Sequence, residues 1–340
     1  MPADQLNAGT ATHAHDAQST AKPDEMAGGV LAVLAGSPLE QVAAGLGVAT
    51  AVLADAIETY QRAGHAALET RAATRDWYQV HVQFPDWDTA ENAAVTRIGP
   101  RLQRLRETSV IAGWWFIRKD PCWRLRIKPG NDVELADMKT ATNTILDGLT
   151  TDGLISRWRH TFYEPETVAF GGRLGMDIAH RLFCFDSGNI LCYLRQPEPA
   201  IGRRELSVLL CSALFRAAGQ EWFECGDIWH GVTQMRPNPT DTPTDRLRAL
   251  AESLRKLLAN DARPTGALFG TDGPLACATS WAAAFHQAGQ ALAAAANEGA
   301  LERGTRDILA HHVIFHWNRI GLPSRTQSIL AHAAKTAIFS

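Results

Sequence analysis

A change of hydrophobic periodicity close to Gly172 limits the folds open to this chain of 340 residues. Before it, apolar and polar residues alternate in short runs, which is the period of half-buried strands. After it, apolar residues recur at helical spacing as far as residue 337. Strands mixed with helices, followed by helices alone, predict an α+β domain in which a mostly antiparallel sheet packs against helices.

The predicted elements follow this division. Helices are expected between the strands, and Lys119-Asp-Pro121 predicts a hairpin turn. The first half predicts strands over 76–84, 110–117, 122–127 and 155–163, with helices over 88–108 and 133–149. The second half predicts helices over 173–186, 203–218, 243–259, 275–297, 303–319 and 324–337, with loops over 236–245 and 261–274.

The N-terminal segment has a different composition from the main domain, which is expected over 74–338. Residues 1–27 contain almost no large apolar side chain, so we expect a disordered tail. Residues 28–70 predict a small module of three helices resembling a helix-turn-helix. Its last helix should run from about Thr50 to Arg62 and end at Gly64.

Two functions suit such a module: recognition of DNA or peptide, or docking. Its last helix carries Asp55 and Glu58 and almost no basic residue. Because phosphate contacts need Lys and Arg, this composition favours docking on the main domain or on a partner.

The overall composition excludes several classes of protein. Charged residues make up 20% and the formal net charge is −3, which predicts no bulk attraction to nucleic acid or membrane. No apolar run is long enough to span a bilayer, and no signal peptide is recognisable. The six cysteines lack C-x-x-C spacing, so neither disulfides nor structural zinc are expected. These features predict a cytoplasmic protein without a metal or cofactor.

Arg124 and Arg126 lie two residues apart on a predicted strand and should point to one face. Two neighbouring guanidinium groups repel each other unless an anion lies between them, although their stems can also cover a solvated sheet edge. Glu164 and Glu166 follow the next strand. They could form a carboxylate pair, bind the arginines, or belong to a charged loop.

His312 and His316 are four residues apart on one predicted helix and share its face. The first interpretation is that the pair binds a metal ion, but the sequence offers no obvious third ligand. The second is that the histidines are packed in the core. The third is that His316 acts as a general acid or base, because the ordinary pKa of histidine lies near neutral pH.

Four segments together carry a family resemblance over roughly residues 74–338. They are Trp114–Arg126, Tyr163–Gly172, Gly175–Ser187 and His311–Gly321. In this order they resemble the C-terminal elimination domain of class I lanthipeptide dehydratases in its stand-alone form, the thiopeptide-type bacteriocin biosynthesis domain. Ala169 and Phe170 stand where that family usually has Arg and Tyr, which removes one cation from the expected site.

The resemblance implies roles for particular residues. It makes His316 the catalytic candidate, with Arg124, Arg126 and Glu166 holding a glutamyl adduct. We further expect the substrate to be bound by Arg118, Tyr163, Asn318 and Arg319. The side chains of Arg124, Arg126, Glu166 and His316 should then converge on one cavity. Asp186-Ser187, by contrast, is expected to end a helix and cap the next.

The resemblance also implies a function in the maturation of ribosomal peptides. The first expectation is a lyase that removes glutamate from glutamylated Ser or Thr, leaving dehydroamino acids. A pyridine synthase that joins two dehydroalanines by a formal [4+2] cycloaddition is the second, and a non-catalytic leader-binding or assembly subunit is the third. The expected partners are a precursor peptide and a glutamylating dehydratase subunit, and a homodimer stays open.

Overall fold

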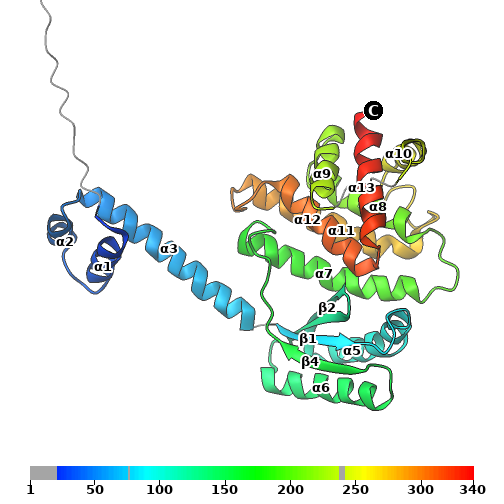
Figure 1. Ribbon diagram of the computed structural model, residues 1–340, viewed down its shortest axis with the longest axis horizontal. Helices are drawn as coiled ribbons and strands as arrows, with labels where there is room; N and C mark the ends of the chain where they lie inside the picture. The colour runs from blue at the N-terminus through cyan, green and yellow to red at the C-terminus, as the bar shows by residue number, and fades with distance from the viewer. Residues whose placement is uncertain (1–20, 76, 237–241) are drawn as a thin grey trace, which may run out of the picture. The chain divides into compact units, whose positions relative to one another are not determined.

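The computed structural model describes residues 21–75, 77–236 and 242–340, which form two compact units (Figure 1). The first unit ends at Ala72 and the second comprises Ala73–Ser340. The expected tail lies partly outside the described residues, which begin at residue 21.

The first unit contains three helices around a small core. They are α1 (Pro23–Leu34), α2 (Leu39–Leu46) and α3 (Thr50–Arg75). Val30, Ala43 and Leu53 are its buried hydrophobic residues. Gly47 ends α2 in a left-handed conformation, with φ of 66°, which glycine adopts without steric cost.

Two boundaries of this unit differ from the prediction. The helix α1 begins at Pro23, so the last residues of the expected disordered tail are helical. The helix α3 continues through Gly64 to Arg75. A single glycine costs a helix only about 1 kcal/mol, and no proline follows to stop it.

The second unit begins with a four-stranded antiparallel sheet. Its strands are β1 (Tyr78–Gln83), β2 (Ile111–Lys119), β3 (Cys122–Pro129) and β4 (Arg157–Thr161). Their order is β2-β3-β1-β4, with all neighbours antiparallel. The crossover from β1 to β2 contains α4 (Ala90–Ala93), a π-helical turn η1 (Ala94–Ile98) and α5 (Gly99–Glu107), and α6 (Leu135–Thr151) joins β3 to β4. This β-α-β-β-α-β arrangement is ferredoxin-like and confirms the predicted antiparallel sheet.

The two faces of the sheet carry different side chains. Val80 and Leu125 lie on the face toward α6, where the Tyr78 hydroxyl donates to Asn143 Oδ1 at 2.8 Å. Residues of the opposite parity, including Trp115 and Arg126, point toward the long helix α7 (Gly172–Leu194). In Figure 1 the sheet lies between α6 and α7. Side chains that act on substrate must therefore be sought on the α7 face.

The remaining helices form a bundle beyond α7. They are α8 (Arg203–Ala217), α9 (Trp222–Gln234), α10 (Thr244–Leu258), η2 (Ala276–Ala278), α11 (Thr279–Asn297), α12 (Thr305–Ile320) and α13 (Ser324–Phe339). The prediction missed α9, because Gly226, His230 and Gly231 interrupt its apolar pattern. A capping box between Glu221 and Glu224 marks its start. The α+β fold class is confirmed.

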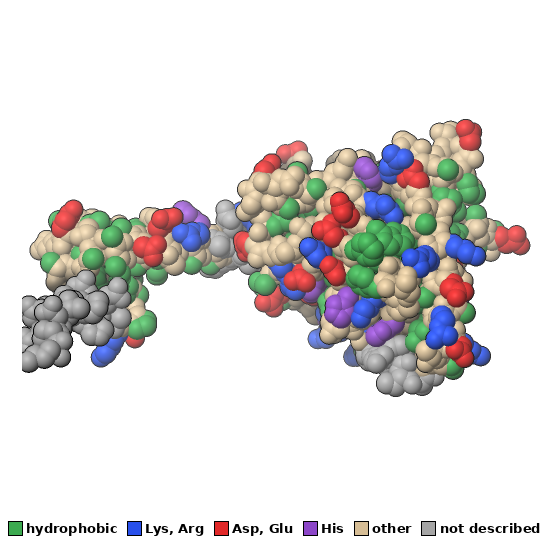
Figure 2. All heavy atoms as spheres, turned by 90° about the horizontal axis from the view of Figure 1, so that it is seen from above, with side chains coloured by type: hydrophobic (Ala, Val, Ile, Leu, Met, Phe, Trp, Pro, Cys, Tyr) green, Lys and Arg blue, Asp and Glu red, His purple; other side chains and the backbone are tan. Residues whose placement is uncertain are grey.

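One end of this bundle carries exposed aromatic side chains. Phe223 on α9 and Phe339 on α13 stack with ring centroids 6.4 Å apart, and both are largely exposed. Beside them, Arg306 pairs with Asp227. Figure 2 looks down on this end of the unit and shows a hydrophobic patch bordered by charged side chains.

A helix that crosses a bilayer must be both long and apolar. Among residues 21–75, 77–236 and 242–340, no single helix is long and apolar enough to cross one. The bent pair Leu39–Leu46 and Thr50–His65 meets the length and composition criteria together.

Candidate active site

Arg126 is a nearly buried cation on the α7 face of the sheet. Its guanidinium carbon lies 4.0 Å from the centre of the Trp115 ring and 4.8 Å from that of Tyr163. Its exposed fraction is 6%, and its Nε and Nη1 have no hydrogen-bond partner among the described residues. Burial lowers the pKa of Arg126 to about 10, with Tyr163 and Glu166 opposing the shift. The side chain therefore stays charged at neutral pH and has free donors.

Arg124 shares this face, as predicted, but is only half-buried. The strand register places His81 opposite Arg124 on one side and opposite Arg159 on the other. Burial lowers the pKa of His81, and these two arginines add to the effect. The result is a basic row across three strands beside Arg126.

Tyr163 joins the Arg126 site to α7. Its hydroxyl lies 2.7 Å from Nε2 of His180. Burial, with smaller effects from Arg126 and Lys128, lowers the pKa of His180 to about 3. At neutral pH the imidazole is therefore uncharged and keeps one ring nitrogen able to accept a proton. Burial also raises the pKa of Tyr163, so the phenol stays protonated.

The loop after Tyr163 places both predicted carboxylates at the surface. Glu164 and Glu166 are exposed, and Glu166 interacts electrostatically with Arg126. The loop closes at Gly171, whose φ is 80°. A Cβ atom there would lie 2.4 Å from Cδ1 of Ile308 on α12, so only glycine allows this close approach.

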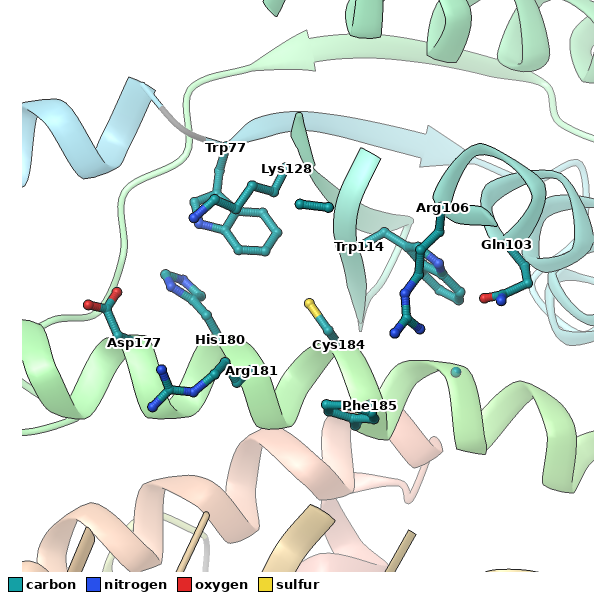
Figure 3. Close-up of a pocket in the computed structure, with 13 residues that line it drawn as sticks. Trp77, Gln103, Arg106, Trp114, Lys128, Asp177, His180, Arg181, Cys184 and Phe185 are labelled. Carbon is teal, nitrogen blue, oxygen red and sulfur yellow. The ribbon is translucent and has the colours of Figure 1, made fainter. Parts of the chain in front are cut away.

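A cavity of about 420 Å³ opens beside the Tyr163–His180 pair, between α7 and the start of β2 (Figure 3). His180 and Trp77 lie on its wall, with ring centroids 4.8 Å apart. Cys184 and Trp114 line it farther along α7. The Tyr163–His180 pair thus has an opening to solvent on one side.

A second buried cluster surrounds Asp186, which is 0% exposed in the middle of α7. Its carboxylate accepts from Trp281 Nε1 at 2.8 Å, from Arg319 Nε at 2.7 Å and from His316 Nδ1 at 3.0 Å. Burial alone would raise the pKa of Asp186, but His316 and Arg319 outweigh it and hold that pKa below its ordinary value. The prediction that Asp186-Ser187 ends a helix is wrong, because α7 continues to Leu194.

His316 is fully buried in this cluster. Its Nδ1 is bound to Asp186, and its Nε2 has no partner among the described residues. The ring packs edge-on to Phe285 at 5.0 Å. His312, one turn earlier, is buried against Phe170, and burial lowers the pKa of His312 to about 3. Both histidines are core side chains in this structure.

The other expected substrate-binding residues have protein partners. Arg118 lies on the opposite face of the sheet, buried in an ion pair with Glu91, which Arg203 also binds at 2.7 Å. Asn318 accepts through Oδ1 from Gln327 Nε2 at 3.0 Å. Arg118, like Arg126, has two nitrogens without a described partner, Nε and Nη2, but Glu91 supplies its counter-charge. The ion pair of Arg118 and the hydrogen bond of Asn318 give both a structural role here.

The structure brings the predicted residues together only in part. Arg126, Tyr163 and Glu166 form one group, and His316 with Arg319 forms another. None of the cavities described within residues 77–236 and 242–340 is lined by members of either group.

The sequence analysis missed His180 and Asp186. Both lie in the Gly175–Ser187 segment, in which His180 was given no role and Asp186 only that of a helix cap. The available signal was polarity: each is an ionisable residue inside an otherwise apolar helical run.

Comparison with known proteins identifies the second unit. A family model described as lantibiotic biosynthesis dehydratase C-term matches residues 77–338, which confirms the predicted resemblance. No curated protein matches the chain.

Three solved structures share the fold. The tRNA-dependent lantibiotic dehydratase MibB from Microbispora sp. 107891 has a TM-score of 0.56 and 16% identity, covering 77% of this chain and 28% of MibB. TsrL has a TM-score of 0.53 and 16% identity, with coverage of 77% and 93%. TbtD, a pyridine synthase from thiomuracin biosynthesis, has a TM-score of 0.54 and 12% identity, with coverage of 77% and 97%. The chain thus spans less than a third of MibB but nearly all of the other two.

Proposed function

The chain belongs to the family of lantibiotic biosynthesis dehydratase C-terminal domains, and we propose that it removes glutamate from glutamylated Ser and Thr side chains of a precursor peptide. A partner subunit supplies the glutamylated peptide. In the elimination, a base takes the Cα proton and the C–H electrons form the Cα=Cβ double bond. The Cβ–O bond breaks, and glutamate leaves as a carboxylate.

The observation that carries this proposal is the buried, unpaired Arg126. A buried cation is costly unless an anion and hydrogen bonds compensate it. Arg126 keeps two donors without a partner, and no described carboxylate forms an ion pair with it. The departing carboxylate of glutamate would supply the missing partner. A cycloaddition expels no carboxylate and gives Arg126 no such ligand.

We assign proton transfer to the Tyr163–His180 pair. The pair lies beside Arg126, borders an open cavity, and contains an imidazole that is neutral at physiological pH. A well-placed base contributes up to about 10²–10⁴-fold to a rate, and its position next to the substrate has to offset the low basicity that burial gives this imidazole. His316, the base expected from the sequence, is enclosed and bound to Asp186. We therefore assign it the positioning of Arg319 through Asp186.

Pyridine synthesis is the second candidate. The family's usual arginine is absent at Ala169, which is half-buried against the core. A site with fewer cations suits a reaction without an anionic leaving group. The fold shared with TbtD is compatible with both reactions, because a fold hosts more than one chemistry.

The test offers the full chain two synthetic peptides and follows their masses. One carries glutamylated Ser, and the other carries two dehydroalanines at a spacing suited to ring closure. We expect conversion of the glutamylated peptide, with loss of one glutamate per modified residue, and no change in the other. Cyclisation of the second peptide alone would replace elimination by pyridine synthesis. Saturable binding without conversion of either would identify a non-catalytic subunit.

The mass of the product distinguishes elimination from background hydrolysis, and a matched pair of variants tests the role of Arg126. Hydrolysis of the glutamyl ester releases glutamate but leaves Ser, whereas elimination leaves dehydroalanine, which is lighter by one water. Arg126→Met should lose the dehydroalanine product, and Arg104→Met, at an exposed position on α5, should keep it.

A further inference from the structure

We propose that a groove between α5 and α7 binds an extended acidic segment of the precursor peptide, which deepens the proposed function. The cavity beside His180 adjoins a second one of about 780 Å³. Both are lined by Gln103, Arg106, Trp114, Cys184, Phe185 and Gly188. Shared walls make them one groove, which runs along α7 from Trp77 to Arg195 and has room for several peptide residues.

The charge of this groove favours an anionic ligand. Arg106, Lys128, Arg181 and Arg195 line it, against Asp177 and Glu107. Arg106, Lys128 and Arg181 form no ion pair with another described residue. In Figure 3, Arg106 points from α5 toward α7, and Arg181 extends along α7 on the side of Asp177. Carboxylate side chains of a peptide would form ion pairs with these cations.

The groove also leads to the proposed reaction site. At one end it is lined by His180, whose Nε2 contacts the Tyr163 hydroxyl under the Arg126 guanidinium. A peptide lying in the groove therefore presents its next residues to these groups. Binding remote from the reacting bond is a common way of positioning a substrate.

Side chains, rather than the edge of the sheet, should recognise the peptide. β2 is an edge strand, but α7 covers it: Ser187 Oγ accepts from the Phe116 amide at 3.2 Å. The Trp114 amide likewise bonds to the Cys184 sulfur. Addition of a peptide strand would have to displace these bonds. The exposed ring of Phe185 and the side chain of Trp114, which both line the groove, can instead contact apolar side chains that lie between the acidic residues of the peptide.

A peptide fits this groove better than a nucleic acid. A nucleic acid carries a negative charge at every phosphate, and Asp177 and Glu107 on the groove walls would repel some of them. A peptide can place acidic residues opposite the arginines and neutral residues opposite the two carboxylates.

The test measures fluorescence anisotropy of a labelled twelve-residue peptide with Glu at every third position and Leu or Ala between. The same peptide with Gln in place of Glu and a labelled single-stranded oligonucleotide of twelve nucleotides are titrated in parallel. We expect saturable binding of the Glu peptide and at least tenfold weaker binding of the other two. The double variant Arg106→Glu/Arg181→Glu should weaken binding of the Glu peptide by roughly tenfold or more.

The matched control is Arg97→Glu/Arg104→Glu, which makes the same charge change on η1 and α5 at exposed positions outside the groove. It should bind the Glu peptide like the wild type. Equal loss in both double variants, equal binding of the Gln peptide, or tighter binding of the oligonucleotide would overturn the proposal. The result is separable from the proposed function, since binding needs no turnover: elimination without Glu-peptide binding refutes the groove alone.

Discussion

Arg126 and Arg319 are both buried arginines on the α7 side of the sheet, yet they differ in their partners. Arg319 donates to Asp186, which also binds His316 and Trp281. Each guanidinium leaves two nitrogens without a described partner, but Arg126 lies between two aromatic rings and has no bonded carboxylate among the described residues. A short aromatic path connects them, because Trp115 contacts Phe183 and Arg319 lies over Phe183 at 4.1 Å.

The difference separates a structural charge from one that awaits a ligand. A buried charge with its counter-charge in place holds neighbouring helices in one arrangement. A buried charge without a bonded counter-charge costs stability, which a ligand's anion can restore. On this basis the Asp186 cluster supports the site, and the Arg126 group carries the chemistry. Each prediction below tests one side of this comparison.

The largest effect is expected from Asp186→Ala. The change leaves Arg319 buried without its counter-charge, which should lower the free energy of unfolding by about 3–5 kcal/mol. Urea unfolding at pH 7 measures it. Asp177→Ala, at an exposed position on the same helix, is the control and should change stability little. Equal effects of the two variants would refute the structural role of the cluster.

The next effect concerns the two histidines. His180→Ala should reduce glutamate elimination by about 10²–10⁴-fold, because it removes the proposed base. His316→Asn retains an N–H that can donate to Asp186, so we expect it to keep most of the activity. Initial rates with a glutamylated peptide measure both. Inactive His316→Asn together with active His180→Ala would return the role of base to His316.

Acid should destabilise the protein through buried histidines. The pKa values of His180 and His312 are each about 3 in the folded chain, mainly through burial, and about 6.5 when unfolded. Between these values the unfolded state binds more protons, so the stabilisation is full above pH 6.5 and falls as pH drops. Each histidine contributes a slope approaching about 1.4 kcal/mol per pH unit.

Urea unfolding between pH 7 and 4.5 tests this sign, and His312→Leu should reduce the slope by about one proton. A stability that stays level over this range would contradict the burial of both rings.

The smallest effect is expected from Arg126→Met. Methionine can fill part of the space between Trp115 and Tyr163 and removes an uncompensated charge, so stability should change by no more than about 1 kcal/mol. Arg319→Met is the matched change in the other group. It leaves Asp186 buried without its arginine, so the free energy of unfolding should fall several times more than in Arg126→Met, by the same unfolding measurement. If the two variants lose equal stability, the contrast between the arginines is wrong.

Periodicity was sufficient to predict the sheet and most helices, because apolar residues recur at the spacing of each element, as Tyr78, Val80 and Val82 do along β1. The hairpin at Lys119-Asp-Pro121 and the shared face of Arg124 and Arg126 followed from spacing alone. Helix ends were less predictable. Asp is a residue type that often caps helices, but Asp186 is buried in the middle of α7, where His316 and Arg319 bind its carboxylate. Those partners are more than 100 residues away in sequence, and no local pattern reveals them.

The sequence was sufficient to name several residues of the candidate site, but not to show which of them are open to solvent. Motif resemblance found Arg126, Tyr163 and Glu166, which lie together. It also named His316, without indicating that Trp281 and Phe285 enclose it. Solvent access depends on the packing of α7, α11 and α12, so the choice between His180 and His316 needed the fold.

The most direct test of the central claim measures dehydroalanine formation in a single turnover, with wild type and Arg126→Met each in excess over a glutamylated peptide. Unfolding curves first establish that both proteins are folded. The account predicts rapid dehydroalanine formation by the wild type and a loss of at least tenfold in the variant. Formation at equal rates, or none with the wild type, would contradict the claim that Arg126 holds the departing carboxylate.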